Sequence, residues 1–225
     1  MSAGKRFVIG DIHGCALTFR ELLFNILKIN KNDTIYLLGD YVDRGPRIKQ
    51  TVDTILELIK DKYKVFPLIG NHEAMMLEYI EKSYEQDSWF RNKGRTTMDS
   101  FNLKSIYDLD LSYLEFFKSL EYYYLLDDFV LTHAGLNFNI ENPLQDKEAM
   151  LWNRDYFVDK KKIGGRRLIS GHSPHTLEKI RYFLNHDKIQ LDGGCVYLNI
   201  FEGMGYLCAL ELNTMEFFSV LNIDY

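Results

Sequence analysis

The sequence predicts an α/β fold, in which strands and helices alternate before a second group of short strands. The first observation is that apolar runs of strand length alternate with runs whose apolar residues recur at helical spacing. The second is that three early apolar runs end in polar side chains, as strands do where they border a binding crevice. The third is a hydrophobic fraction of 46% in 225 residues, which is ample for a buried core.

The first third of the chain is expected to hold three units, each a strand followed by a helix. The strands are expected at residues 6–10, 34–38 and 64–69, and the helices at residues 17–29, 48–59 and 73–82. The clearest helix places Ile48, Val52, Ile55 and Ile59 on one stripe, which is typical of a helix that packs on a sheet. Strands and helices that alternate in this way form parallel sheets with right-handed connections.

From about Tyr122 the pattern changes to short strands with turns between them, which favours a more antiparallel arrangement. These strands are expected at residues 122–126, 129–132, 167–170, 179–184, 188–191, 206–212 and 216–221. No repeat, low-complexity tract or flexible linker divides the chain. Residues 1–225 are therefore predicted to form a single domain, with the polar segment 81–110 as a cap or insertion.

The composition argues against several classes of protein. A formal net charge of -5 disfavours a nucleic-acid-binding surface, which normally needs a basic excess. No apolar stretch approaches the roughly 20 residues that span a bilayer, and Asp11 comes too early for a secretory signal. The three cysteines include no C-x-x-C pair, so neither a disulfide framework nor a thiolate zinc site is expected. A reduced, cytoplasmic setting fits these features best.

Polar side chains with metal-binding chemistry stand at the ends of the apolar runs. They are Asp11, His13, Asp40, Asn71, His72, His133 and His172. Carboxylate, imidazole and amide groups suit manganese, iron or zinc and lack the thiolates of structural zinc sites. Since six or more such groups converge, two ions about 3.5–4 Å apart are favoured over one.

Five segments carry these residues and resemble the motifs of a known family. In chain order they read "GDIHG", "GDYVDRG", "GNHE", "THAG" and "SGHS". Their content and order resemble the calcineurin-like metallophosphoesterases, specifically the phosphoprotein phosphatases. "LWNR" at 151–154 resembles the segment that carries an arginine in compact phage and bacterial protein phosphatases. Ala134 departs from the family pattern, because eukaryotic members usually have a second glycine there.

The resemblance implies a calcineurin-like four-layer α/β/β/α sandwich with two central mixed β-sheets and a dinuclear metal site at the strand ends. It assigns six metal ligands: Asp11 and His13 for the first ion, Asp40 as the bridge, and Asn71, His133 and His172 for the second. Arg44 and Arg154 would hold the substrate phosphate. His72, paired with Asp43, would protonate the leaving oxygen. The two ions, manganese before iron or zinc, would activate a bridging hydroxide that attacks phosphorus directly.

Several of these residues have a structural alternative. Asp43 and Arg44 could form an ordinary turn with a surface ion pair, and Arg154 could be a surface arginine. Asp192 is expected in a turn or behind the ligands. For another group of residues a structural role is favoured over a functional one: His175, His186, Arg166, Arg167 and the aromatic pair Trp89 and Phe90.

Three functions remain open at the level of sequence. The favoured one is a metal-dependent serine/threonine protein phosphatase that acts on phosphoserine and phosphothreonine. The second is a hydrolase of dinucleoside polyphosphates such as diadenosine tetraphosphate, although the chain is shorter than expected for that group. The third is a protein-binding scaffold with a relic site, which the complete ligand set disfavours. The expected partner is a phosphorylated protein or small phosphoester, with no nucleic acid and no membrane, and the sequence does not indicate an oligomeric state.

Overall fold

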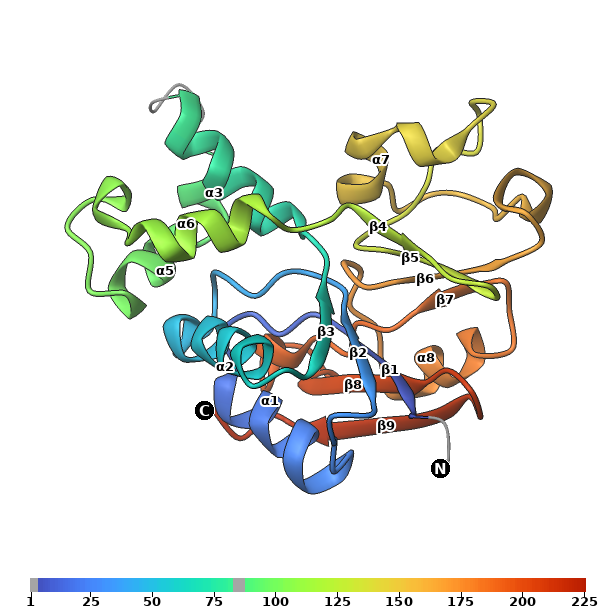
Figure 1. Ribbon diagram of the computed structural model, residues 1–225, viewed down its shortest axis with the longest axis horizontal. Helices are drawn as coiled ribbons and strands as arrows, with labels where there is room; N and C mark the ends of the chain where they lie inside the picture. Colours follow the sequence, from blue (N-terminus) through green and yellow to red (C-terminus); the bar gives the residue numbers. More distant parts are fainter. Residues whose placement is uncertain (1–3, 83–87) are drawn as a thin grey trace.

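The computed structural model describes residues 4–82 and 88–225, which form two β-sheets with helices around them (Figure 1). The larger sheet has the strand order β3-β2-β1-β8-β9. Its strands are β1 (Arg6–Ile9), β2 (Thr34–Leu37), β3 (Lys64–Pro67), β8 (Tyr206–Glu211) and β9 (Glu216–Leu221). The first three strands are parallel, as predicted, whereas β8 runs antiparallel to both β1 and β9.

The smaller sheet has the order β4-β5-β6-β7 and corrects two expectations. Its strands are β4 (Tyr123–Leu125), β5 (Phe129–Thr132), β6 (Arg167–Ser170) and β7 (Lys188–Gln190). Only β4 is antiparallel to its neighbour, and β5, β6 and β7 are parallel, so the antiparallel expectation is wrong for most of this sheet. The strand expected at residues 179–184 is also wrong, because that segment belongs to helix α8 (Leu177–Phe183).

Helix α8 has the sequence features of a helix. Thr176 caps its start, with Oγ1 accepting a hydrogen bond from the Lys179 amide at 3.4 Å. Leu177, Ile180 and Leu184 recur at helical spacing and pack into the apolar cluster between the sheets. A parallel connection from β6 to β7 needs a crossover of this kind, which explains both wrong expectations together.

The helices of the first third lie where the periodicity predicts them. They are α1 (Ala16–Arg20), continued by the π-helical turn η1 (Glu21–Ile26), α2 (Ile48–Lys60) and α3 (Asn71–Lys82). The remaining helices are α4 (Ser88–Arg91), α5 (Gly94–Ser100), η2 (Ile106–Asp108), α6 (Leu111–Lys118), η3 (Pro143–Gln145), α7 (Lys147–Trp152), η4 (Lys160–Ile163) and η5 (Cys195–Tyr197). No helix among the described residues is long and apolar enough to cross a membrane.

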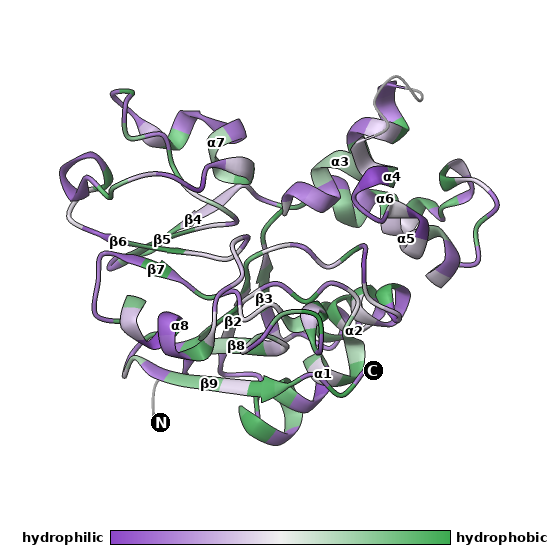
Figure 2. Cartoon of the chain, turned by 180° about the vertical axis from the view of Figure 1, so that it is seen from behind, coloured by the Kyte–Doolittle hydropathy of each residue, from purple (hydrophilic) through white to green (hydrophobic). Residues whose placement is uncertain are grey.

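The four layers follow from the alternation of side chains along the strands. Phe7 and Ile9 of β1 face the cluster formed with α1 and α2, whereas Val8 between them faces the second sheet. In the second sheet, Val130 and Leu168 pack on the opposite side in a cluster that includes Met150 of α7. Figure 2 shows hydrophobic segments in β5, β6 and β7, the strands of this sheet. The expected α/β/β/α sandwich is confirmed.

The predicted cap at 81–110 includes residues 83–87, which lie outside the described part of the chain. Its described part forms short helices that extend from the larger sheet on the side of α3 (Figure 1). Helix α4 contacts α3, and α5 contacts α2. Trp89 of α4 is fully buried, so this segment is packed into the structure by a large apolar side chain.

The end of the chain is fastened to the start of α1. The buried Asp224 carboxylate accepts hydrogen bonds from the Leu17 amide at 3.1 Å and the Thr18 amide at 2.9 Å. It also accepts one from the Thr18 hydroxyl at 2.7 Å. These bonds satisfy amide groups that the first turn of a helix leaves without a partner.

We therefore expect Asp224→Ala to lower the free energy of unfolding by about 1–3 kcal/mol, because it leaves buried donors without an acceptor. Urea denaturation followed by circular dichroism measures this loss. Asp128→Ala is the matched control, since its carboxylate pairs with Arg6 at 3.1 Å on an exposed surface and should cost less than about 1 kcal/mol. Equal losses for the two variants would contradict the role of Asp224.

Candidate metal centre and active site

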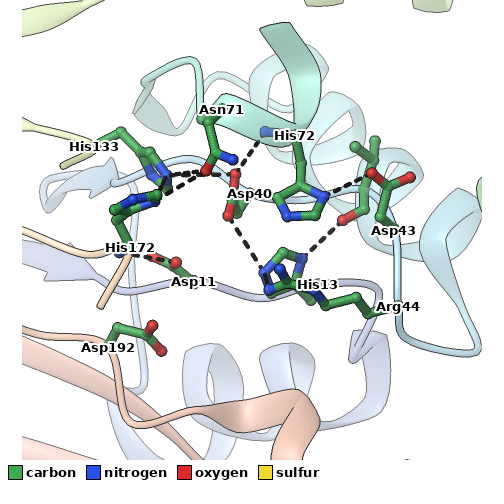
Figure 3. A network of polar contacts seen from close by, with 12 residues as sticks. Asp11, His13, Asp40, Asp43, Arg44, Asn71, His72, His133, His172 and Asp192 are labelled. Atoms are coloured by element: carbon green, nitrogen blue, oxygen red, sulfur yellow. Dashed lines mark hydrogen bonds and ion pairs between the residues drawn. The ribbon is translucent and has the colours of Figure 1, made fainter. Parts of the chain in front are cut away.

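The candidate ligands follow five strands of the two sheets. Their side chains lie close together in Figure 3. Asp11 and His13 follow β1, Asp40 follows β2, Asn71 and His72 begin α3 after β3, His133 follows β5, and His172 follows β6. All seven residues are buried, with 6% or less of their surface exposed. The structure thus brings together residues that lie as far apart in the chain as Asp11 and His172. These groups are costly to bury unless they have partners.

Three of them converge at one point. The Nδ1 atom of His133 lies 2.8 Å from the Leu38 carbonyl, so it carries the proton and Nε2 presents a lone pair. That Nε2 lies 2.9 Å from Asn71 Oδ1 and 3.1 Å from His172 Nδ1. Asn71 Oδ1 and His172 Nδ1 are themselves 3.0 Å apart. At most one proton, on His172, is available for these three acceptors.

Two buried atoms beside this point have no hydrogen-bond partner. They are His172 Nε2 and Asp11 Oδ1. If His172 carries its proton on Nε2, that N–H group has no acceptor. The three acceptor atoms then face one another with no proton between them. If the proton is on Nδ1, a buried lone pair is left on Nε2. Buried polar atoms without partners are rare, and a cation at the convergence satisfies the acceptors.

Asp40 joins this group to a second one. Its Oδ1 lies 3.5 Å from His133 Nε2, and its Oδ2 lies 3.3 Å from His13 Nε2. The His13 ring is oriented in the same way as that of His133, with Nδ1 at 2.9 Å from the Val42 carbonyl. In the part of the chain that the structure describes, two groups could hold a metal ion, and Asp40 belongs to both. One consists of His13, Asp40 and His72, and the other of Asp40, His133 and His172.

The group of His13, Asp40 and His72 differs in one residue from the ligands expected for the first ion, which were Asp11, His13 and the bridging Asp40. His72 rather than Asp11 lies with His13 and Asp40, and the His13 and His72 rings meet edge to face with centroids 4.7 Å apart. Asp11 contacts a member of the other group, because its Oδ2 accepts a hydrogen bond from the His172 amide at 2.9 Å. The free Asp11 Oδ1 keeps this carboxylate available as a ligand. Its assignment to the first ion stays a prediction.

The protonation states suit metal binding. Burial lowers the pKa of His13 to about 4 and that of His172 to about 2. Burial also lowers the pKa of His133. For Asp40, burial opposes ionisation, but His133, His72 and His13 outweigh it and hold the pKa well below its usual range. Near neutral pH, His13, His133 and His172 are therefore neutral and Asp40 is ionised, which are the forms that bind cations. Asp11 differs, because burial and the nearby carboxylates of Asp192 and Asp40 raise its pKa well above the usual range.

His72 and Asp43 form the predicted pair. His72 Nδ1 lies 2.7 Å from Asp43 Oδ2, and both side chains are buried. Burial opposes protonation of His72, but the carboxylates of Asp40 and Asp43 outweigh it and raise the His72 pKa. The pair thus favours the protonated imidazole that a general acid needs.

Trp89 and Thr97 hold Asp43 in place. From sequence, Trp89 was expected only to pack, and Thr97 was not singled out. Trp89 Nε1 donates to Asp43 Oδ1 and Oδ2 at 3.0 and 3.1 Å. Thr97 Oγ1 donates to Asp43 Oδ1 at 2.5 Å. Trp89 was expected to pack, which it does, but its indole also fixes the orientation of the carboxylate. The described part of the 81–110 segment is therefore connected directly to the site.

Glu73 is the other residue that the sequence analysis did not single out. Its buried carboxylate accepts hydrogen bonds from the amides of Gly70, Asp40, Tyr41 and Val42 at 2.8–3.0 Å. It therefore fastens the loop of Asp40 to the start of α3. Burial raises the pKa of Glu73 to about 7. Its place at the end of "GNHE" was the signal available in the sequence.

The backbone at the site is strained. His13, Asp40, Asp43, Arg44 and His172 all have positive φ angles, between 45° and 70°. This left-handed region costs side chains other than glycine of order 1–3 kcal/mol each, and such residues cluster at functional sites. These residues lie in the loops that follow β1, β2 and β6, and the strain is consistent with a functional role for each.

The two predicted phosphate-binding arginines occupy different positions. Arg44 lies in the site, with Nη1 2.7 Å from His13 Nε2. Arg154 is exposed in the segment after α7, where its charge adds to burial in lowering the pKa of His133 and His172. Arg154 is thus within electrostatic range of the site, and its contact with substrate stays a prediction.

The other candidates largely keep structural roles. His175 lies against Gln190 and Phe183, and His186 contacts the Tyr182 carbonyl. Arg166 donates to the Leu126 carbonyl, and Arg167 donates to the Leu184 and His186 carbonyls. Asp192 accepts from the Gly194 amide at 2.8 Å in the expected turn. It is buried beside the site in Figure 3, and burial raises its pKa to about 6.

Comparison with known proteins places this site in a wider context. A family model described as calcineurin-like phosphoesterase matches residues 5–204. The symmetrical bis(5'-nucleosyl)-tetraphosphatase of Wigglesworthia glossinidia brevipalpis is 39% identical over 87 residues, which span 37% of this chain but only 30% of that relative. The asymmetrical bis(5'-nucleosyl)-tetraphosphatase of Anoxybacillus flavithermus is 25% identical over 95% of this chain and 92% of that relative.

Two further comparisons involve protein phosphatases. Serine/threonine-protein phosphatase 2 of Salmonella typhimurium is 34% identical over 91 residues, which span 39% of this chain and 38% of that protein. A solved serine/threonine phosphatase from Saccharomyces cerevisiae has a TM-score of 0.66 at 17% identity and covers 93% of this chain and 73% of its own. At that identity the likeness shows the fold alone.

The strained backbone leads to a prediction at Arg44, where φ is 70°. Arg44→Gly and Arg44→Ala remove the same guanidinium, but only alanine keeps the cost of the left-handed conformation. We expect the glycine variant to be more stable by about 1 kcal/mol in urea denaturation.

Arg95 in helix α5 is the matched control. In a helix alanine is the better residue, so Arg95→Ala should be more stable than Arg95→Gly by about 1 kcal/mol, which reverses the order. If Arg44→Ala were more stable than Arg44→Gly, as is expected for the pair at Arg95, residue 44 would not be held in a left-handed conformation.

Proposed function

This chain belongs to the calcineurin-like phosphoesterase family, and from that premise we propose that it hydrolyses bis(5'-nucleosyl) tetraphosphates such as diadenosine tetraphosphate. The observation that carries the proposal is the alignment with the A. flavithermus tetraphosphatase, which covers 95% of this chain and 92% of that relative. The alignment with the Salmonella protein phosphatase covers less than two fifths of either chain. The proposal therefore puts the dinucleoside polyphosphate reading ahead of the protein phosphatase favoured from sequence.

The length of the chain does not oppose this reading. From sequence, dinucleoside polyphosphate hydrolases were expected to be longer than this chain, but the A. flavithermus relative is matched over almost all of both proteins. The expectation is therefore wrong for that relative. In the W. glossinidia relative, the matched part is less than a third of the protein.

The donor set fits two divalent cations, with Asp40 shared between them. Three acceptors that meet within 3.1 Å and the unpartnered oxygen of Asp11 are arranged as ligands rather than as hydrogen-bonding partners. His13, Asp40, Asn71, His133 and His172 would hold the ions together with Asp11. Bound there, divalent cations stabilise charge on a phosphoryl group and lower the pKa of water, and manganese is the proposed metal.

The protein's own groups complete the reaction. Arg44 presents a permanently charged, planar guanidinium to the phosphate, which stabilises charge on its equatorial oxygens. His72 holds a proton for the leaving oxygen, and Asp43 stabilises the charged imidazole at 2.7 Å. Trp89 and Thr97 fix the position of Asp43 and so act as positioning residues. The leaving group is a nucleotide, and water supplies the oxygen that remains on the cleaved phosphorus.

The test is a product analysis of diadenosine tetraphosphate incubated with the protein and manganese. Two molecules of ADP report symmetrical cleavage, and AMP with ATP reports asymmetrical cleavage. We expect one of these patterns, with kcat/KM for diadenosine tetraphosphate exceeding that for a phosphoserine peptide by roughly a hundredfold. Chromatography of the nucleotides measures the products.

Asp40→Asn is the control for contaminating hydrolases, because the lost charge removes the shared ligand and should abolish both activities. If the peptide is dephosphorylated efficiently and diadenosine tetraphosphate is left intact, the chain is a protein phosphatase and the proposal is wrong. If the manganese-loaded protein has neither activity, the result would support the hypothesis of a protein-binding scaffold instead.

A further inference from the structure

A pocket of about 440 Å³ opens beside Arg44, and its lining comes from four parts of the chain: residue 44, residues 91–96, residues 196–200 and residue 225. Arg44 follows Asp43 of the acid pair. Asn92, Lys93 and Thr96 lie between Trp89 and Thr97, the two residues that hold Asp43. Its volume is within the range of about 300–1,000 Å³ that small-molecule sites occupy.

Arg44 connects this pocket to the metal ligands. One end of its guanidinium lies 2.7 Å from His13 Nε2, and its Cζ lies 5.6 Å from the centre of the Tyr197 ring. Tyr197 belongs to the third segment of the lining, residues 196–200, which follows Asp192. A ligand in the pocket would therefore share Arg44 with a phosphate at the metal centre.

The charge of the pocket favours an anionic ligand. Its lining includes the cationic side chains of Arg44 and Lys93, and no carboxylate side chain is found among the described residues that line it. This contrasts with the formal net charge of -5 for the whole chain. A concave, locally cationic surface raises the local concentration of anions, even on an acidic protein.

The apolar part of the lining favours a flat ring. Tyr197 is partly buried and held against Arg44, Tyr225 is 63% exposed, and Ile200 is 64% exposed. Aromatic rings and arginine planes are the surfaces on which nucleobases stack, with about 1–3 kcal/mol for each stacked base. Cations and stacking rings in one small pocket match the two halves of a nucleotide.

We infer that this pocket binds one nucleoside of the substrate, with its base against Tyr197 and Tyr225 and its phosphates directed past Lys93 and Arg44 to the metal centre. The inference rests on the proposed function, because it takes a dinucleoside polyphosphate as substrate. It assigns substrate selection to the 92–96 and 196–200 segments and to Tyr225, none of which carries a metal ligand.

The test compares ADP with inorganic pyrophosphate as inhibitors of p-nitrophenyl phosphate hydrolysis by the manganese-loaded protein. Both are diphosphates, and only ADP carries a nucleoside. We expect the inhibition constant of ADP to be about tenfold lower in the unaltered protein, as one stacked base would give. Lys93→Gly and Tyr225→Ala should raise the ADP constant toward that of pyrophosphate.

Two matched variants separate this effect from a general change. Lys62 is exposed and has a φ of 66°, close to the 75° of Lys93, so Lys62→Gly removes a similar lysine away from the pocket. Tyr225→Phe keeps the ring. Both should retain the preference for ADP. Glycine suits the positive φ of both lysines, so neither lysine variant is expected to unfold the protein.

The outcomes distinguish this inference from the proposed function. If diadenosine tetraphosphate is hydrolysed but ADP and pyrophosphate inhibit equally, the pocket does not bind the nucleoside and the inference is wrong. The same holds if all four variants alter the preference alike. If the preference for ADP depends on Lys93 and Tyr225 but diadenosine tetraphosphate is not cleaved, the pocket binds a nucleotide and the proposed substrate is wrong.

Discussion

The structure depends on one electrostatic constraint: several hydrogen-bond acceptors are buried at a single place, where too few N–H or O–H groups are available to donate to them. His133 donates a hydrogen bond from Nδ1 to the Leu38 carbonyl, so its Nε2 faces Asn71 and His172 as an acceptor. Asp40 reaches from this group to His13 with a second oxygen. Buried in this way, the groups are compatible with a stable fold when cations lie among them.

The two sheets supply the residues, and the surrounding groups keep them in place. Glu73 fastens the Asp40 loop to α3 through four backbone amides, and left-handed backbone at His13, Asp40 and His172 points the side chains inward. Glycines allow the backbone to approach two of the carboxylates closely. A side-chain carbon added at Gly171 would collide with the Asp11 carboxylate, and one at Gly70 would collide with that of Asp40. Packing and strain therefore serve the same arrangement of charges.

Much of this could be predicted from local sequence. The parallel β1, β2 and β3 followed from hydrophobic periodicity, and the clustering of Asp40, His133 and His172 followed from their positions after strands. Helix α8 was missed because its seven residues are too few for the helical spacing of Leu177, Ile180 and Leu184 to decide between strand and helix. The parallel pairing of β6 with β7, which requires a crossover between them, is not visible in the local sequence. Trp89 and Thr97 were missed as partners of Asp43 because their hydrogen bonds span 46 and 54 residues, a separation that local patterns do not encode.

The central claim is that the converging acceptors form a cation site, and its most direct measurement is the metal content of the purified protein together with its thermal stability. We expect about two equivalents of divalent metal per chain. We also expect a chelator to lower the midpoint of unfolding and added manganese to restore it, because ligands that bind only the folded state stabilise it. His133→Ala should bind less metal and respond less. An unfolding midpoint that is the same in chelator and in manganese, with no metal bound, would contradict the account.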